Sequence, residues 1–428
     1  MRNTSDAVWW MNSQGAVSPA LWRSEFMRGV MDFSLVLRNG QVIDPSQNIN
    51  RVMDIAVRDG RIAEIGDGLG SGQVEEDVRG KYVCPGLIDL HGHWWEGSCW
   101  GIDPDICLNY GVTTVVDAGT TGFINFPDFR KNQVGGAAIR VLAFVNVSAI
   151  GLLTTLVGEL EDIRFARPSE TARVIDANRD ICVGVKLREG AMSGRNGMEA
   201  LDKALQAAES VRLPLMVHIT KGADTRHILP RLRRGDIVTH CLQGRGDGMV
   251  SEGGECLLPE AIDARNRGVV FDLGHGAGAF SWAVARRAFE RGFYPDTIST
   301  DLHRFSVERW AYNMPAVMCK MLHLGMALED VIRKSTWAPA EVLGRGGELG
   351  SLKPGSTADI FVFELEPGQF PLEDTHLRTE YASRRIKPVL TVKGGVTIEP
   401  GSYPTRLREL YECDYDLLRF VEQTANPS

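Results

Sequence analysis

The sequence has no long apolar run, no cysteine pair spaced for a zinc ribbon and no excess of positive charge. None of its hydrophobic segments reaches the roughly 18 residues of a membrane span, and the first thirty residues lack the apolar stretch of a secretory signal. We therefore expect a cytoplasmic protein with no membrane partner. A net charge of -8 over 428 residues leaves no basic stripe for nucleic acid. The expected partner is a small molecule, and a homo-oligomer stays open.

The eight cysteines include no Cys-x-x-Cys pair, which argues against a disulfide framework as well as a zinc ribbon. We expect reduced and mostly buried thiols. A hydrophobic content of 43% with 24% charged residues is typical of a globular protein. The length suits one large barrel or two to three ordinary domains.

Short segments rich in valine, isoleucine and leucine recur eight times along the middle of the chain. They are CPGLIDLHGH, TTVVDAGT, AIRVLAFVNVS, ICVGVKLR, PLMVHI, DIVTHC, GVVFDLGHG and DTISTDLH. Stretches with helical spacing of apolar residues separate most of them, as at 196–212 and 257–268. Eight apolar strands alternating with helices predict an α/β fold, a (β/α)₈ TIM barrel over residues 84–344.

Both flanks of the barrel sequence have the pattern of short strands joined by tight turns. Residues 32–83 contain Asp59-Gly60, and residues 345–400 contain Gly394-Gly395, both of which are hairpin signals. The two flanks predict one small, discontinuous, sandwich-like β-domain. Residues 1–31 and 401–428 fit neither domain, and we expect them to form an N-terminal extension and a C-terminal segment.

The stretch LIDLHGHWW, residues 87–95, ends an apolar run with two histidines one residue apart. Because side chains alternate along a strand, His91 and His93 face the same side, as a chelating pair requires. Two hydrogen-bonded histidines at a strand end would give the same pattern. Active sites of TIM barrels lie at the carboxyl ends of the strands, and four more strand-end residues are ionisable: Lys186, His218, His240 and Asp301. Six such residues predict a metal site, because zinc-like ions prefer imidazole and carboxylate ligands.

From residue 32 to about 400 the chain resembles the amidohydrolase superfamily of metal-dependent hydrolases. The motifs are PGLIDLHGH, VGVKLR, MVHI, IVTHC, ISTDLH and GSLKPGSTADIFVFE. Within the superfamily, GVTTVVDAGTTGFINFPDFR, DLGHGAGAFSW and STDLH resemble the deacetylase branch related to dihydroorotases. The resemblance implies an enzyme that removes acetyl from an N-acetyl-D-amino acid or an O-acetyl 2-hydroxy acid.

The resemblance also implies two divalent ions, most simply zinc. Their ligands would be His91, His93 and Asp301 for the more buried ion, and His218 and His240 for the more exposed one. Lys186, carboxylated by carbon dioxide, would bridge both, since a lysine carbamate is a carboxylate-like anion and a neutral lysine offers a single nitrogen. The two ions would activate a shared water. Asp301 would be the catalytic proton carrier, first as general base and then as general acid.

Substrate recognition is expected at the same end of the barrel. Arg188 follows Lys186 by two residues and so faces the same way, and its guanidinium suits a substrate carboxylate, although a surface salt bridge fits equally well. His275 lies between two glycines and is either a donor to the substrate carbonyl or a core histidine. Further candidates for the pocket wall are Gly119, Thr120, Thr121, Trp94, Trp95, Asn125 and His303.

Two other functions stay open from the sequence. A cyclic amidohydrolase would open a ring such as dihydroorotate or hydantoin, but dihydroorotases typically carry His-X-His-X-Arg, and Trp95 stands where that arginine would be. A non-catalytic scaffold would be expected to have lost ligands, and all six are present. Lys186 also disfavours the branch of N-acyl-D-amino-acid deacylases that has a cysteine at the bridging position.

Overall fold

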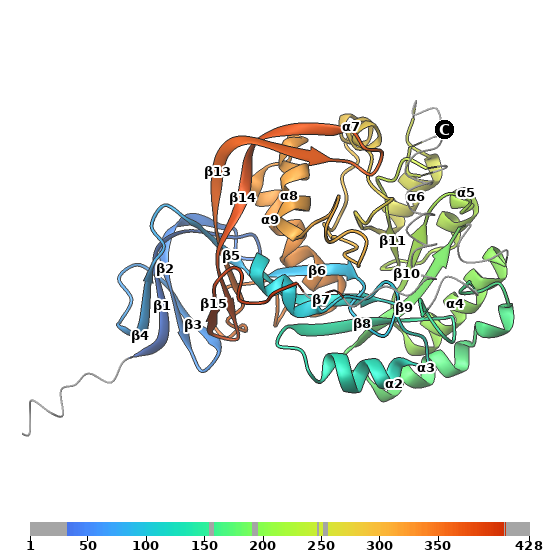
Figure 1. Ribbon diagram of the computed structural model, residues 1–428, viewed down its shortest axis with the longest axis horizontal. Coiled ribbons are helices and arrows are strands. Elements are labelled where there is room, and N and C mark those ends of the chain that lie inside the picture. Colours follow the sequence, from blue (N-terminus) through green and yellow to red (C-terminus); the bar gives the residue numbers. More distant parts are fainter. Residues whose placement is uncertain are drawn as a thin grey trace, which may run out of the picture.

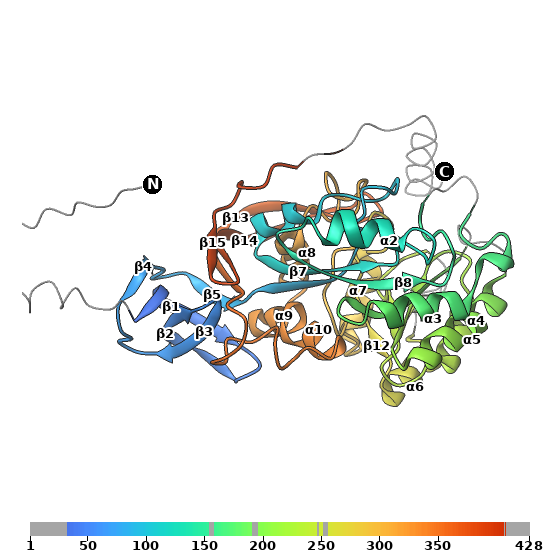
Figure 2. The ribbon, with the colours of Figure 1, turned by 90° about the horizontal axis from the view of Figure 1, so that it is seen from below.

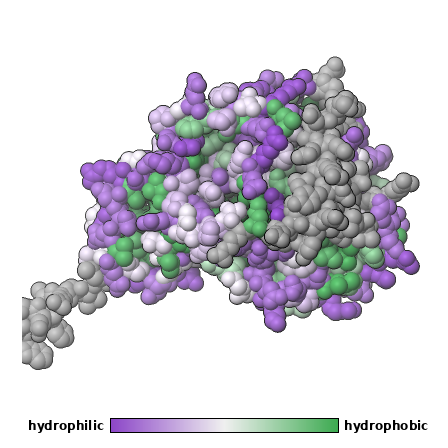
Figure 3. Space-filling view, viewed as in Figure 1, coloured by the Kyte–Doolittle hydropathy of each residue, from purple (hydrophilic) through white to green (hydrophobic). Residues whose placement is uncertain are grey.

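The computed structural model describes residues 32–153, 158–190, 196–245, 248–250, 256–405 and 407. The expected extension 1–31 and most of the segment 401–428 lie outside the described residues. Figure 1 shows a small sheet at one end of the molecule and a larger, helix-covered sheet at the other. No helix in the described ranges combines the length and the apolar character needed to cross a membrane. On the face seen in Figure 3, hydrophilic side chains separate the apolar patches over both parts.

The larger sheet is the predicted barrel. Seven parallel strands lie side by side in chain order. They are β6 (Leu87–Gly92), β7 (Val112–Ala118), β8 (Arg140–Asn146), β9 (Cys182–Glu189), β10 (Leu215–Ile219), β11 (Ile237–Thr239) and β12 (Val270–Phe271). Their side chains are buried almost throughout, as in a parallel sheet covered on both faces.

The eighth predicted strand, 296–303, is reduced to two isolated parallel bridges. Thr297 pairs with Asp272 just beyond β12, and Leu302 pairs with Gly92 at the end of β6. These bridges close the barrel. Asp301 has a left-handed backbone with φ of 47°, and such a residue interrupts the extended geometry that strand pairing needs. Backbone hydrogen bonds from Leu273 to Thr297, from His275 to Ser299 and from His93 to Leu302 hold the segment between its two neighbours. The prediction of a barrel is confirmed, and its eighth member is an irregular segment rather than a regular strand.

Helices cover the outside of the barrel, and Figure 2 shows α3, α4, α5 and α6 along one side. The longer helices are α3 (Pro168–Ala177), α4 (Gly197–Val211), α6 (Pro259–Arg267), α7 (Trp282–Glu290), α8 (Met314–His323), α9 (Leu328–Ser335) and α10 (Trp337–Val342). The short ones are α2 (Phe126–Asp128), α5 (Thr225–Ile228), η1 (Pro104–Tyr110), η2 (Phe129–Val134), η3 (Ile163–Phe165) and η4 (Leu229–Arg231). In α4 a stripe of alanines with Leu201 and Val211 is buried against the sheet. The helical spacing predicted for 196–212 is thus confirmed.

The small sheet is mixed and takes strands from both flanks of the barrel. Its strands are β1 (Phe33–Asp44), β2 (Ile49–Arg58), β3 (Arg61–Gly66), β4 (Gly72–Asp77), β5 (Tyr82–Pro85), β13 (Ile360–Glu373), β14 (Thr379–Lys393) and β15 (Val396–Ile398). The β5–β13 pairing joins the two flanks. Asp59 and Gly60 turn between β2 and β3 with φ of 51° and 71°, and Gly394 and Gly395 turn between β14 and β15, as the two hairpin signals predict. The long β13–β14 hairpin arches over α8 towards α7 (Figure 1).

Candidate metal centre

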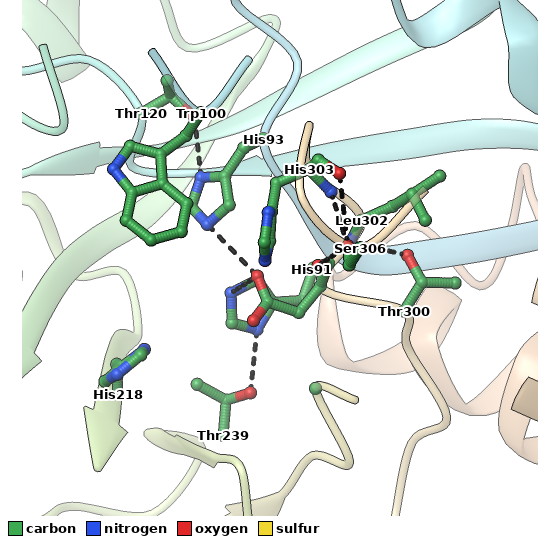
Figure 4. A network of polar contacts seen from close by, with 12 residues as sticks. His91, His93, Trp100, Thr120, His218, Thr239, Thr300, Leu302, His303 and Ser306 are labelled. Atoms are coloured by element: carbon green, nitrogen blue, oxygen red, sulfur yellow. Dashed lines mark hydrogen bonds and ion pairs between the residues drawn. The ribbon is translucent and has the colours of Figure 1, made fainter. Parts of the chain in front are cut away.

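The end of β6 and the loop that closes the barrel bring three of the predicted ligands together. Oδ1 of Asp301 lies 3.4 Å from Nε2 of His91 and 3.2 Å from Nε2 of His93. All three side chains are buried, and one ligand atom from each lies within 4.8 Å of the others. Figure 4 shows His91 and His93 close to each other, next to His303 of the closing loop.

The donor set fits a cation. Burial lowers the pKa of His91 and of His93 well below the ordinary value, so both rings are neutral. Their Nδ1 atoms are engaged by hydroxyl groups, His91 with Thr239 at 2.8 Å and His93 with Thr120 at 2.9 Å. Within the described part of the chain, Oδ1 of Asp301 is buried and makes no hydrogen bond. Three electron-rich atoms therefore face one another, and a positive ion placed between them would satisfy all three.

A second histidine pair lies next to this group. His218 ends β10 and His240 follows β11, and Nε2 of His240 is 2.6 Å from Nδ1 of His218. Nδ1 of His240 donates to the carbonyl of Gly274 at 2.6 Å, which leaves Nε2 as the acceptor. Burial lowers the pKa of His240 to about 4. The rings of His91 and His240 are 5.1 Å apart, so the two pairs form one continuous cluster.

Lys186 points into this cluster rather than into solvent. Its side chain is fully buried, and Nζ lies 3.4 Å from Nε2 of His91 and 3.4 Å from Sδ of Met216. Burial lowers the pKa of Lys186 to about 7, although the nearby Asp301 carboxylate opposes the shift. Gly119, with φ of 74°, packs against the lysine stem, where an added Cβ would lie 2.5 Å from Lys186 Cβ. A lysine that is easily neutralised therefore stands beside the ligands.

Two ligands and their neighbouring loop have unusual backbones. His240 and Asp301 have φ of 70° and 47°, a region that side chains enter at a cost and that is common at functional sites. The glycine-rich loop after β12 packs directly on them. A Cβ at Gly276 would clash with Oδ2 of Asp301, so only glycine allows the loop to approach this carboxylate so closely.

Arg188 forms a buried ion pair instead of a surface salt bridge. Its Nη1 donates to Oε1 of Glu159 at 2.7 Å, and both side chains are less than a tenth exposed. Its guanidinium also lies over the ring of Trp100, 5.5 Å from the centroid. Trp100 in turn packs edge-on against His303 at 4.9 Å, beside His93 (Figure 4). The guanidinium is therefore held in a fixed place next to the metal-binding group.

The two remaining candidate histidines differ in what they offer to a substrate. Nδ1 of His303 accepts a hydrogen bond from the backbone N–H of Phe305 at 3.1 Å, so the ring proton must sit on Nε2 and is available. His275 has no free nitrogen, because Nδ1 donates to Gly276 O at 2.9 Å and Nε2 accepts from Lys320 Nζ at 2.7 Å. The prediction that His275 donates to a substrate carbonyl is therefore corrected to its alternative, a core histidine.

The other predicted wall residues divide in the same way. Gly119 and Thr120 lie against Lys186 and His93, and Thr121 is buried beside them with its hydroxyl unbonded in the described structure. The polar groups of the others bind within the fold: Trp94 Nε1 donates to Val116 O and Trp95 Nε1 donates to Asp128. Asn125 donates from Nδ2 to Ile150 O and accepts at Oδ1 from the backbone N–H of Gly122. The sequence analysis did not predict a role at the site for five residues: Glu159, Trp100, Thr239, Asp117 and Asp272. Asp117 and Asp272 could have been found, since both are carboxylates at the ends of apolar strands.

A closed TIM barrel with a buried His-His-Asp group at the carboxyl ends of its strands defines a metal-dependent hydrolase. Residues 82–398 match the model of the Amidohydrolase family, and the chain belongs to that family. A deacetylase of Enterococcus faecalis is 34% identical over 376 residues, 85% of this chain and 99% of the relative. A solved structure described as an adenine deaminase is 32% identical with a TM-score of 0.80, covering 86% of this chain and all of its own. Another, described as a dihydroorotase, is 30% identical with a TM-score of 0.79, covering 87% and 99%.

Proposed function

We propose that this protein is a deacetylase that uses two zinc ions to release acetate from an N-acetyl-D-amino acid or an O-acetyl 2-hydroxy acid. The observation that carries the proposal is the buried Arg188, fixed by Glu159 beside the metal-binding group. Such a guanidinium suits a carboxylate next to the scissile bond. The 34% identity to the Enterococcus deacetylase over nearly its full length supports the same reaction.

In this proposal His91, His93 and Asp301 would hold one ion, and His218 and His240 would hold the other. Lys186 would join them as a carbamate, and its lowered pKa favours the neutral amine that reacts with carbon dioxide. When bound, two such ions supply an activated water and polarise the substrate carbonyl.

The residues of the chain then divide the remaining work. Arg188 binds the substrate carboxylate and orients the acetyl group. His303 donates its Nε2 proton to the substrate carbonyl, which makes it the counterpart of the donor expected at His275. Asp301 receives the proton of the attacking water and returns it to the leaving amine or alkoxide. Water is excluded by Trp100, which covers His303 and Arg188.

The test is a substrate panel with the purified protein. It contains acetylated 2-hydroxy acids and N-acetyl amino acids in both enantiomers, together with dihydroorotate and hydantoin, and zinc content is measured on the same samples. We expect close to two ions per chain and acetate release from one enantiomeric series. Activity confined to the cyclic compounds, or acetate release by a zinc-free sample, would refute the proposal.

Ring opening of a cyclic amide is the second candidate, favoured by the similarity to the structure described as a dihydroorotase. Against it stands Trp95, whose Nε1 is bound to Asp128 and whose position has no cationic group for a ring carboxylate. The same panel separates the two reactions. We also propose a small-molecule partner, with no nucleic-acid or membrane partner and a homo-oligomer left open, and a cytoplasmic location; the panel addresses neither the assembly nor the location.

A further inference from the structure

We propose that two aspartate–threonine pairs, Asp272–Thr239 and Asp117–Thr120, position His91 and His93 by fixing which ring nitrogen carries the proton. The consequence is that the ion held by these histidines with Asp301 is the more tightly bound of the two. The inference rests on the proposed binuclear site. It concerns groups that do not touch substrate and act only through the two histidines.

The first pair, Asp272 and Thr239, lies on the Nδ1 side of the His91 ring. Asp272 is fully buried and accepts hydrogen bonds from three hydroxyl groups, those of Thr239 at 2.8 Å, Thr297 at 2.7 Å and Ser299 at 2.7 Å. A threonine hydroxyl has one proton, and Thr239 gives it to Asp272. In its 2.8 Å contact with Nδ1 of His91 the hydroxyl must therefore accept. His91 carries its proton on Nδ1 and presents the lone pair of Nε2 to Asp301.

The threonine is needed as the link. Nδ1 of His91 lies 3.6 Å from Oδ2 of Asp272, which is too far for a direct hydrogen bond. Thr239 bridges that gap from the last position of β11, directly before the ligand His240. One strand end thus supplies a ligand to one ion and the support for a ligand of the other.

The second pair repeats the arrangement at His93 with residues from a different strand. Asp117 accepts from the backbone N–H groups of Trp94 at 2.9 Å and Thr120 at 2.7 Å. Burial raises the pKa of Asp117 to about 6, and the neighbouring Thr120 hydroxyl opposes that rise. The same hydroxyl lies 2.9 Å from Nδ1 of His93. In the proposal Thr120 directs its proton to Asp117, as Thr239 does to Asp272, so that both histidines of one ion carry their proton on Nδ1 and leave Nε2 free.

The histidines of the other ion lack this support within the described residues. His240 donates from Nδ1 to a neutral backbone carbonyl, that of Gly274. His218 presents Nδ1, not Nε2, to the cluster. A carboxylate behind a ligand raises its basicity, and loss of such a partner typically costs 10–100-fold in metal affinity. This difference in hydrogen bonding is the reason for the predicted difference in affinity.

The experiment compares three variants in which a buried threonine is replaced by valine, a side chain of nearly the same shape without the hydroxyl. Thr239→Val and Thr120→Val each break one relay, and Thr297→Val is the matched control, because its hydroxyl binds the same Asp272 and no histidine. Thr239→Ser restores the hydroxyl. Zinc dissociation constants of the full-length metal-free chains are measured by chelator competition, with circular dichroism to verify folding.

We expect the dissociation constant of the tighter zinc ion to rise 10–100-fold in Thr239→Val and in Thr120→Val, and that of the weaker ion to change less. Thr297→Val and Thr239→Ser should bind like the unchanged protein. Equal zinc affinities in Thr239→Val, Thr120→Val and Thr297→Val would overturn the inference.

A second readout needs neither zinc nor substrate. Long-range ¹H–¹⁵N spectra of the metal-free protein report the tautomer of each histidine, and we expect Nδ1–H for His91 and His93, with the signal of His91 changed in Thr239→Val. If His91 or His93 of the unchanged protein carried its proton on Nε2, this inference would be overturned and the proposed function would not be affected. A protein that binds no zinc would overturn both the affinity difference and the proposed function, whereas inactivity on the substrate panel with normal zinc binding would overturn only the latter.

Discussion

Nη1 of Arg188 donates a 2.7 Å hydrogen bond to Oε1 of Glu159, and the pair is enclosed beside the histidine cluster. Burial raises the pKa of Glu159, and the positive charge of Arg188 is the largest of the effects that lower it. Asn146 donates to the other carboxylate oxygen at 3.3 Å. Glu159 is thus fixed at both oxygens, and among the described residues it is the hydrogen-bond partner that orients the guanidinium of Arg188.

We predict that Glu159→Gln raises KM for carboxylate-bearing substrates about tenfold, with a smaller change in kcat, because the amide leaves the buried guanidinium without its countercharge and holds it less firmly in place. The measurement is steady-state kinetics with the best panel substrate. The exposed neighbour Glu161→Gln is the matched control and should leave KM unchanged. An equal rise in KM for an analogue whose carboxylate is an amide would contradict the role of Arg188.

Asp301→Asn should lower kcat at least about 10²-fold, the lower end for loss of a positioned general acid–base. An amide retains one ligand oxygen, so we expect zinc content to fall much less than kcat. Metal analysis and kinetics on the same preparation check both statements. Near-normal turnover by this variant would show that another group carries the proton.

Lys186→Ala should abolish binding of the second zinc ion and most of the activity, because an anionic bridge between two cations is lost. We expect acetate or propionate to restore part of the activity by filling the space of the missing side chain. Added bicarbonate should accelerate zinc reconstitution of the unchanged protein and have no effect on the variant. A variant that keeps two ions and full turnover without added acid would exclude the carbamate.

His240→Asn should release the more exposed ion and leave the ion held by His91, His93 and Asp301 in place. The reason is that His240 hydrogen-bonds His218 and only packs against the ring of His91, whereas the close contacts of Asp301 are with His91 and His93. Zinc content per chain should fall from about two to about one. Two ions and full activity in this variant would mean that the end of β11 is not part of the site.

Lys320 should make stability depend on pH. Its Nζ donates to His275 and to the carbonyls of Trp310 and Glu373, yet burial still lowers its pKa from 10.5 to about 7. Between these two values the unfolded chain binds one more proton than the folded chain, so the free energy of unfolding rises with pH there. Below about pH 7 the lysine is charged in both states and contributes no slope.

The comparison is made with Lys320→Met, which removes the titrating group. The difference in unfolding free energy between the unchanged protein and the variant should increase from pH 7 to pH 9 and stay level from pH 5.5 to pH 6.5. Denaturant unfolding at each pH measures it. A difference that stays level from pH 7 to pH 9 would show that the three acceptors keep Lys320 charged in the folded protein and its pKa high.

The sequence alone was enough for the barrel and for the residue types of the candidate metal centre. Strand positions follow from local apolar runs, and parallel strands of a closed barrel end at the same rim. The six residues His91, His93, Lys186, His218, His240 and Asp301 could therefore be placed together from the sequence, before any contact between them was known. The irregular backbone of the eighth segment could not be predicted, because the left-handed conformation of Asp301 leaves no trace in an apolar pattern.

Only the tertiary structure decided what each polar side chain does at that rim. The sequence allowed two interpretations each for Arg188 and His275. Their partners in the structure, Glu159 and Lys320, lie far away in the sequence and distinguish between these interpretations. The hydroxyl relay below His91 likewise joins residues from β6, β11 and the end of β12. A buried polar group must find a partner wherever the fold brings one. That partner is set by which strands and loops become neighbours in space, and local sequence carries no record of it.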